Sequence, residues 1–359
     1  MSAGGPSGGP VGPASDGSDP LAAYLDGLDG IVAELAAAPG PDPSARAAVA
    51  GRAERVLRPR EAFARLDEVA VWLAGWQRSD RPAVSAPAAI VFVADHGVAS
   101  SGVSAYPAEV TAAMHRALEE GAATAAVMAA RLGASLRVVD VGVGRPTKDL
   151  VDAPALDRDR FRACFETGRR ALAALHDDDD VDLLVLGEMG IGNTTAAAAV
   201  CACLFGLPGR EWTGRGTGVD AESLERKVAA VERARARVGE ARPLEILRQV
   251  GGSELAALAG AACEARLRSI PVVLDGFVVT AALAALEAEA PGALDNCVAG
   301  HRSSEPGHRI LLEKLGKEPL LDLDLRLGEG SGALLAVPII ALAAAAVVEV
   351  ATFEEWGLA

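Results

Sequence analysis

The stretch DLLVLGEMGIGNTTAAAAVCACLFG, residues 182–206, decides the fold of this chain. It has the pattern of a short apolar strand, a glycine-rich turn and an alanine-rich helix. Five other apolar runs lie at residues 88–97, 136–144, 270–277, 294–303 and 320–330. Continuous apolar strands that alternate with helices are typical of a parallel sheet covered on both faces. We therefore expect an α/β fold around a mostly parallel sheet.

The first 87 residues carry different patterns. Residues 1–20 are dominated by Gly, Pro and Ser, which predicts a disordered tail, and they lack the basic and apolar regions of a secretory signal. In residues 21–77 apolar side chains such as Leu25, Leu28 and Leu35 recur at helical spacing. No strand-like run precedes residue 88, so we expect 21–87 to be a helical segment.

Composition excludes several classes of function. The chain has 359 residues, a formal net charge of −15 and an isoelectric point near 4.9. General nucleic-acid binders and anionic-membrane binders need an exposed basic surface, which such a chain lacks. The five cysteines include no Cys-x-x-Cys pair, so we expect reduced thiols and a cytoplasmic protein. The longest apolar run, 333–348, is short, alanine-rich and interrupted by Pro338, which predicts a buried core helix and no membrane span.

Polar and glycine residues cluster where the predicted strands end. These clusters are Asp95–Gly97, Gly187–Gly190, Asp275–Gly276, Gly300–Ser303 and Gly328–Ser331. In open α/β sheets, ligands bind outside the carboxyl ends of the strands. We therefore expect one common site, which favours an enzyme or a small-molecule binder over a structural protein.

The segment GEMGIGNTT, residues 187–195, predicts a phosphate site. Its glycines allow close approach of the backbone, and the following helix presents N–H groups and its positive dipole end to an anion. The spacing matches a phosphate-binding P-loop, but Asn193 stands where the lysine of that motif belongs. This argues against nucleoside-triphosphate hydrolysis. The alternative is a purely structural glycine-rich turn.

Two further motifs suggest chemistry. GRGTG, residues 214–218, followed by Lys227, is a second possible phosphate cradle, although a lysine in such a charged helix is usually solvated. In LRLGEGSG, residues 325–332, Glu329 follows an apolar strand, where poor hydration raises the pKa of a carboxyl and suits a general base. The alternative for Glu329 is a carboxylate stabilised by a helix N-terminus.

The sequence gives little support for a metal site or for a serine hydrolase. His301 and His308 are seven residues apart, roughly 10 Å along a helix, so they cannot share one ion if that stretch is helical. No Gly-x-Ser-x-Gly elbow of a serine hydrolase is present. We expect neither a metal site nor a cofactor.

Six segments taken in order resemble the nicotinate-nucleotide–dimethylbenzimidazole phosphoribosyltransferase family. They are residues 94–111, 186–199, 214–220, 272–283, 299–308 and 323–340. The resemblance runs from about residue 50 to the C-terminus. It implies a doubly wound parallel-sheet domain with a smaller helical domain, a homodimer, and a role in assembly of the lower ligand of cobalamin. With it, we expect the α/β domain to span 88–345 and a C-terminal helix, 346–359, to pack with the helical segment.

The resemblance also implies a reaction and its residues. The 5-phosphoribosyl group moves from nicotinate mononucleotide to a benzimidazole, which gives α-ribazole 5′-phosphate and nicotinate, with Glu329 as general base. The implied base-binding residues are Glu188, Met189, Leu327, Ser104, Tyr106 and Ala113. The implied nucleotide-binding residues are Gly190, Gly192, Asn193, Thr194, Gly216, Thr217, Gly218, Lys227, Asp275, Gly276, Ser303, Gly328 and Gly330.

Some positions depart from the family pattern. Residues 58–68 read RPREAFARLDE instead of a Pro-Gly-Ser-Leu-Gly stretch, Ala113 stands where a glutamine borders the base, and 120–124 read EGAAT. These departures leave the identity of the acceptor base open. The rival hypotheses are a regulatory paralogue that binds the nucleotide without turnover, and a degenerate nucleoside-triphosphate binder that uses residues 187–194.

Overall fold

The computed structural model describes Met1 and residues 20–358 of the chain. The predicted disordered tail, 1–20, therefore lies almost entirely outside the described residues. The helices of the described part are α1 (Pro20–Ala37), α2 (Pro43–Ala53), α3 (Arg65–Gln77), α4 (Val110–Glu119), α5 (Thr124–Leu132), α6 (Arg158–Asp179), α7 (Asn193–Phe205), α8 (Gly209–Trp212), α9 (Ala221–Val238), α10 (Pro243–Val250), α11 (Ser253–Leu267), α12 (Phe277–Glu289), α13 (Pro306–Lys314) and α14 (Ser331–Val348). A short 3-10 helix spans Gly97–Ser101.

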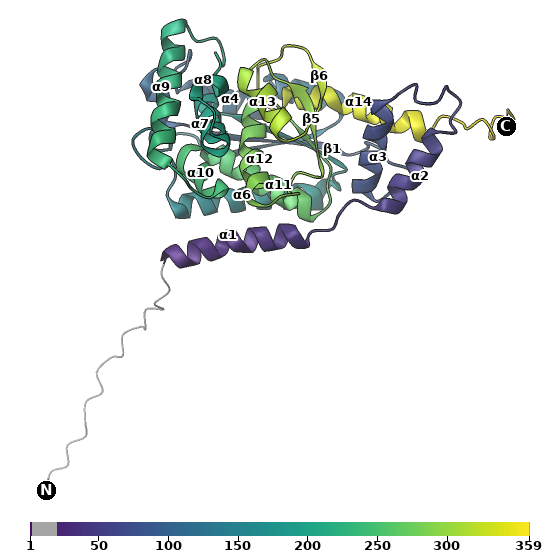
Figure 1. The fold of residues 1–359 in the computed structure, drawn as a ribbon, viewed down its shortest axis with the longest axis horizontal. Coiled ribbons are helices and arrows are strands. Elements are labelled where there is room, and N and C mark those ends of the chain that lie inside the picture. Colours follow the sequence, from purple (N-terminus) through teal and green to yellow (C-terminus); the bar gives the residue numbers. More distant parts are fainter. Residues whose placement is uncertain (2–19, 359) are drawn as a thin grey trace.

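Six strands form one parallel sheet, as the apolar runs predicted (Figure 1). They are β1 (Pro87–Ala94), β2 (Ser135–Gly142), β3 (Leu183–Met189), β4 (Val272–Leu274), β5 (Cys297–Arg302) and β6 (Pro319–Asp322). The strand order is β2-β1-β3-β4-β5-β6, and every neighbouring pair is parallel. The chain moves from β1 to β2 on one side and then returns to β3 on the other. The carboxyl ends of β1 and β3 therefore flank a switch point, where open α/β sheets bind ligands.

Alternation along the strands divides the core into two layers. In β1, Ile90 and Phe92 point into one cluster, whereas Val91 and Val93 point into the other. The first cluster includes side chains from α6, α7, α11 and α12, and the second includes side chains from α3, α5 and α14. Both faces of the sheet are therefore covered by helices, which explains why β1 is apolar and buried at every position.

Glycines allow α6 and α11 to touch along their backbones. A Cβ added at Gly168 would lie 1.9 Å from the carbonyl oxygen of Ala257. A Cβ added at Gly260 would lie 1.9 Å from the carbonyl oxygen of Phe165. Neither glycine can accept a side chain without separating the helices. This contact shows how a chain with 4 % aromatic residues still packs a large core from small residues.

The C-terminal helix α14 belongs to the core. It is long and apolar enough to cross a membrane by length and composition, but 61 % of its residues are buried inside the protein. Leu334, Val337 and Ile340 pack in the second core cluster beside β1, β3 and β4. The predicted buried core helix is confirmed.

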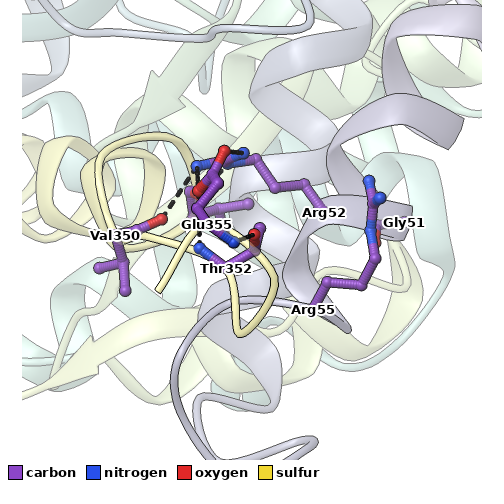
Figure 2. Close-up of polar contacts among 7 residues, drawn as sticks. Gly51, Arg52, Arg55, Val350, Thr352 and Glu355 are labelled. Atoms are coloured by element: carbon purple, nitrogen blue, oxygen red, sulfur yellow. Dashed lines mark hydrogen bonds and ion pairs between the residues drawn. The ribbon is translucent and has the colours of Figure 1, made fainter. Parts of the chain in front are cut away.

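The end of α14 and the segment after it join the N-terminal helices α2 and α3. Val347 packs with Val49 and Ala74 in a third small cluster. Arg52 of α2 donates hydrogen bonds to the carbonyl oxygen of Val350 (3.0 Å) and to both carboxylate oxygens of Glu355 (3.1 and 3.2 Å), as Figure 2 shows. The expected helix over 346–359 is wrong beyond Val348, since the chain turns there and is held by Arg52.

Candidate active site

A cavity opens at the carboxyl ends of β3, β4 and β5. Eleven of the predicted site residues line it: Glu188, Met189, Gly190, Asn193, Thr194, Gly216, Thr217, Gly276, Ser303, Leu327 and Gly328. Its free volume is about 80 Å³. Leu327, which is one of its lining residues, is exposed. A larger hollow of about 770 Å³ lies between α2 and α3, and no predicted site residue lines it.

Close backbone approach shapes the floor of the cavity. A Cβ added at Gly187 would lie 2.5 Å from the carbonyl carbon of Glu329 and 2.5 Å from the nitrogen of Gly330. Strand β3 therefore lies directly against the turn that carries Glu329. Gly192 has a φ of +97° and precedes the first residue of α7, which suits glycine at this helix start. The strand–turn–helix pattern of 182–206 is thus confirmed.

Lys227 and the loop 214–218 form the basic end of the site, together with Arg326. Lys227 is buried, and its ammonium donates hydrogen bonds to Thr194 Oγ1 (2.9 Å) and to the carbonyl oxygen of Gly214 (3.1 Å). The alternative of a solvated lysine is wrong, because α9 directs this side chain inward. Burial lowers the pKa of Lys227, and the nearby Glu305 carboxylate opposes this effect. A small adjoining pocket, lined by Ser104, Gly192 and Lys227, continues from this end.

Glu188, Asp275 and Glu329 form the acidic end of the site. Glu188 is buried and accepts a hydrogen bond from the side-chain amide of Asn193. Burial raises the pKa of Glu188 well above its ordinary value, and the neighbouring carboxylates of Glu254, Asp275 and Glu329 raise it further. Glu188 therefore ionises less readily than an exposed glutamate.

Glu329 is held in an uncommon backbone conformation. Its φ is +63°, its backbone N–H donates to the Glu188 carbonyl (3.1 Å), and its Oε2 accepts from the backbone N–H of Ala125 (3.2 Å). Burial raises its pKa, whereas the hydrogen bond from Ala125 lowers it. The sequence suggested either a poorly hydrated carboxyl or a carboxylate stabilised by a helix N-terminus, and the structure has features of both. The Glu329 side chain is poorly hydrated, and it also contacts the N-terminus of α5. Its side chain does not line the cavity as the structure stands.

Asp275 supports the turn that carries Glu329. Its carboxylate accepts hydrogen bonds from the backbone N–H groups of Gly330 (3.2 Å) and Ala333 (3.0 Å). Its Oδ1 also lies 3.3 Å from His301 Nε2. Asp275 is buried and does not line the cavity, so its contacts favour a supporting role over direct contact with a nucleotide.

Several predicted residues lie away from the cavity. Ala113 is on the exposed face of α4, and Tyr106 is 51 % exposed. Gly218 and Gly330 also line neither pocket. The side chain of α4 that reaches the site is Thr111, whose Oγ1 accepts the backbone N–H of Ile191 (3.2 Å). This geometry gives no support to the expectation that Ala113 borders a ligand.

Three further polar residues line the cavity. The sequence pattern placed His301 in a strand-end cluster of the expected site without giving it a role, and it did not indicate Glu305 or Arg326. His301 lies in β5 and Glu305 follows this strand, on either side of the predicted Ser303. The cluster GHRSSEP contained this signal, but only Ser303 was selected from it. Among the described residues, no group of three or more His, Cys, Asp or Glu side chains has the arrangement of a metal site.

Comparisons with known proteins agree with the geometry. A family model described as phosphoribosyltransferase matches residues 38–358. Nicotinate-nucleotide–dimethylbenzimidazole phosphoribosyltransferase of Cereibacter sphaeroides is 45 % identical over 94 % of this chain and 99 % of its own length. The enzyme of the same name from Ruegeria pomeroyi is 49 % identical over 90 % of this chain and 95 % of its own.

Solved structures give the same answer. The crystal structure of the enzyme of that name from Thermus thermophilus has a TM-score of 0.84 and 41 % identity, over 89 % of this chain and 99 % of its own. The fold and the coverage of both chains agree with these relatives. The chain therefore belongs to the nicotinate-nucleotide–dimethylbenzimidazole phosphoribosyltransferase family.

Proposed function

We propose that this protein transfers the 5-phosphoribosyl group of nicotinate mononucleotide to a benzimidazole, with dimethylbenzimidazole as the acceptor named in its relatives. The observation that carries the proposal is the division of the site into a basic and an acidic end. Nicotinate mononucleotide has a matching polarity, because it holds a phosphate at one end and a cationic ring nitrogen at the other.

The acidic end suits the chemistry at C1′. The ring nitrogen of the nucleotide is already cationic, so the bond from C1′ to this nitrogen breaks with its electron pair returning to nicotinate. A benzimidazole nitrogen forms the new bond to C1′ from the opposite face, which inverts the anomer and gives the α product. The other benzimidazole nitrogen then loses its proton to the Glu329 carboxylate. One base is sufficient, and no acid is needed for the leaving group.

The roles of the other residues follow from their position in this scheme. Glu188 faces the aromatic rings and stabilises the positive charge that passes between them. Asp275 positions Glu329 through the backbone of Gly330. Lys227 and the amide groups near Gly190 and Gly192 hold the phosphate.

The resemblance also supports a homodimer with small-molecule substrates. The unpaired cysteines support a cytoplasmic protein, and the acidic composition argues against binding to nucleic acid or to an anionic membrane. The reaction as written consumes only the two substrates, so the proposal includes no cofactor and no metal.

The decisive experiment incubates the protein with nicotinate mononucleotide and dimethylbenzimidazole. Release of nicotinate together with α-ribazole 5′-phosphate, measured by chromatography, is the expected result. Binding of the nucleotide without any turnover would instead favour the regulatory paralogue. Hydrolysis of a nucleoside triphosphate would support the degenerate binder.

A further inference from the structure

A carboxylate stands inside the basic end of the site. Glu305 precedes α13 and is 7 % exposed. Its Oε1 accepts the backbone N–H of Gly216 (2.8 Å), whereas its Oε2 is buried without a hydrogen-bond partner. A Cβ added at Gly214 would lie 2.2 Å from this Oε2, so the free oxygen lies against the glycine loop.

The groups around Glu305 come from several elements. Lys227 of α9 and Arg326 of the segment before Gly328 are the cations that act on its carboxylate. His301 of β5 lines the same cavity. His308 of α13 is the nearest imidazole on its own element, and burial lowers the pKa of His308 to about 3, so that ring is neutral. Burial raises the pKa of Glu305, and Lys227 opposes this effect.

An ionised carboxylate beside a doubly charged phosphate is unfavourable, since two like charges in a desolvated site repel strongly. One proton placed between the two groups removes the conflict and turns repulsion into a short, charge-assisted hydrogen bond. A phosphomonoester oxygen is basic enough to hold this proton near neutral pH, because the second pKa of the group is about 6. Sulfate oxygens are much weaker bases, so they share such a proton with a carboxylate far less well.

We infer that Glu305 is a specificity residue of the basic end, and that it shares one proton with the bound phosphomonoester and thereby selects phosphate over sulfate. The inference rests on the proposed function for the identity of the nucleotide. In the binding step one proton from solvent joins the phosphate dianion and the Glu305 carboxylate. No covalent bond forms or breaks.

Glu305→Gln separates this role from a structural one. The amide oxygen of glutamine can still accept the N–H of Gly216, and its NH₂ group can donate to a fully ionised anion. Glu211→Gln is the matched control, because Glu211 is an exposed carboxylate on the neighbouring α8 that does not line the cavity. Circular dichroism and thermal unfolding establish whether both variants are folded. If Glu305→Gln does not fold, Glu305→Asp, which keeps a carboxylate, is used as the second variant.

The test is calorimetric titration with nicotinate mononucleotide at about pH 8, where the phosphate of the free nucleotide is almost fully ionised. The titration is repeated in two buffers of different ionisation enthalpy, and the difference in heat gives the number of protons taken up on binding. The wild type and Glu211→Gln should take up about one proton on binding, and Glu305→Gln none. Nicotinate riboside, which lacks the phosphate, should bind without uptake in all three proteins. In competition with the nucleotide, the wild type should prefer inorganic phosphate to sulfate by about tenfold or more, and Glu305→Gln should reduce this preference to a few-fold.

The outcomes distinguish this inference from the proposed function. Binding of nicotinate mononucleotide to the wild type without proton uptake would overturn the role of Glu305. Uptake that persists in Glu305→Gln would also overturn it and would assign the proton to Lys227. If the nucleotide does not bind at all, the proposed function fails, and titration with inorganic phosphate alone still tests Glu305.

Discussion

Glu329 is the residue on which the proposed chemistry depends most. Glu329→Gln keeps the side-chain shape and the hydrogen bond from Ala125 but removes the proton acceptor. We expect turnover to fall by roughly 10²–10⁴-fold, while nicotinate mononucleotide binds as tightly as before. Steady-state kinetics and calorimetry measure the two quantities. Glu313→Gln, at an exposed position of α13, is the control and should leave both unchanged.

The pH profile provides a separate check on Glu329. Because burial raises its pKa, the group is protonated over part of the range in which an ordinary glutamate is ionised. A base acts only when deprotonated, so wild-type turnover should rise with pH through this raised pKa. The residual activity of Glu329→Gln should lack that limb. A limb that persists in the variant would identify another group as the base.

Lys227 should matter for the phosphate and not for the nucleoside. Lys227→Met fills nearly the same volume without a charge. We expect it to weaken nicotinate mononucleotide binding by about 1.5–3 kcal/mol, the contribution of a charge-assisted hydrogen bond. Nicotinate riboside should bind almost equally to both proteins. An equal loss for both ligands would place Lys227 away from the phosphate.

Individual residues were the least predictable part of the site. Glu188 was indicated because it lies within a glycine-rich motif, and Lys227 was indicated because it follows one. Ala113 was selected by resemblance alone, and the helical rotation that exposes it and buries Thr111 depends on packing across the sheet. Glu305 was missed because its partner, the N–H of Gly216, lies 89 residues away in the sequence.

At the scale of elements, the contact between β3 and the 328–330 turn should resist any added atom. Gly187→Ala places a methyl group against backbone atoms that cannot rotate away. We expect a loss of about 1–3 kcal/mol in the free energy of unfolding, together with reduced turnover as Glu329 moves.

Gly51→Ala is the matched control for this prediction. Gly51 lies in α2, and nothing lies within 4 Å of a Cβ added there. Alanine favours helix over glycine, so the variant should gain about 0.5–1 kcal/mol. Chemical denaturation of both variants gives the comparison. If Gly187→Ala and Gly51→Ala change the free energy of unfolding equally, the effect of alanine comes from backbone preference alone, and the contact at Gly187 is unimportant.

Elements were predicted well wherever apolar periodicity was strong. The six apolar runs became six strands because buried parallel strands need apolar side chains on both faces, which leaves a clear local signal. The segment after Val348 has no such signal. Its conformation depends on Arg52, nearly 300 residues earlier in the chain, and this explains why the expected terminal helix was wrong.

For the whole molecule, the ion pair between Arg52 and Glu355 should link stability to pH. The guanidinium of Arg52 and the backbone N–H of Thr352 lower the pKa of Glu355 to about 2, from an ordinary value of 4.5. A group with a lowered folded-state pKa stabilises the fold above its unfolded pKa and loses this effect as pH falls toward the folded value. The stabilisation is therefore complete near neutral pH and declines between about 4.5 and about 2.

Glu355→Gln tests this linkage. The variant should have a lower Tm than the wild type at neutral pH, and the difference should shrink as the pH falls below 4.5. Arg55→Gln is the control, because it removes a neighbouring cation whose side chain donates to the carbonyl oxygen of Gly51 and not to Glu355, and it should show no such convergence. A Tm difference that stays constant with pH would indicate that Glu355 acts through packing alone.

The acidic end also determines how the cycle closes. While nicotinate is bonded to the ribose, its cationic nitrogen is attracted to these carboxylates. After the transfer the ring is neutral, and the free product carries only its negative carboxylate. In the proposed reaction, Glu329 then returns its proton to solvent, and the expelled ring lies beside a restored carboxylate. We therefore expect regeneration of the base to favour departure of the leaving group and to disfavour recapture of nicotinate, which the reverse reaction requires.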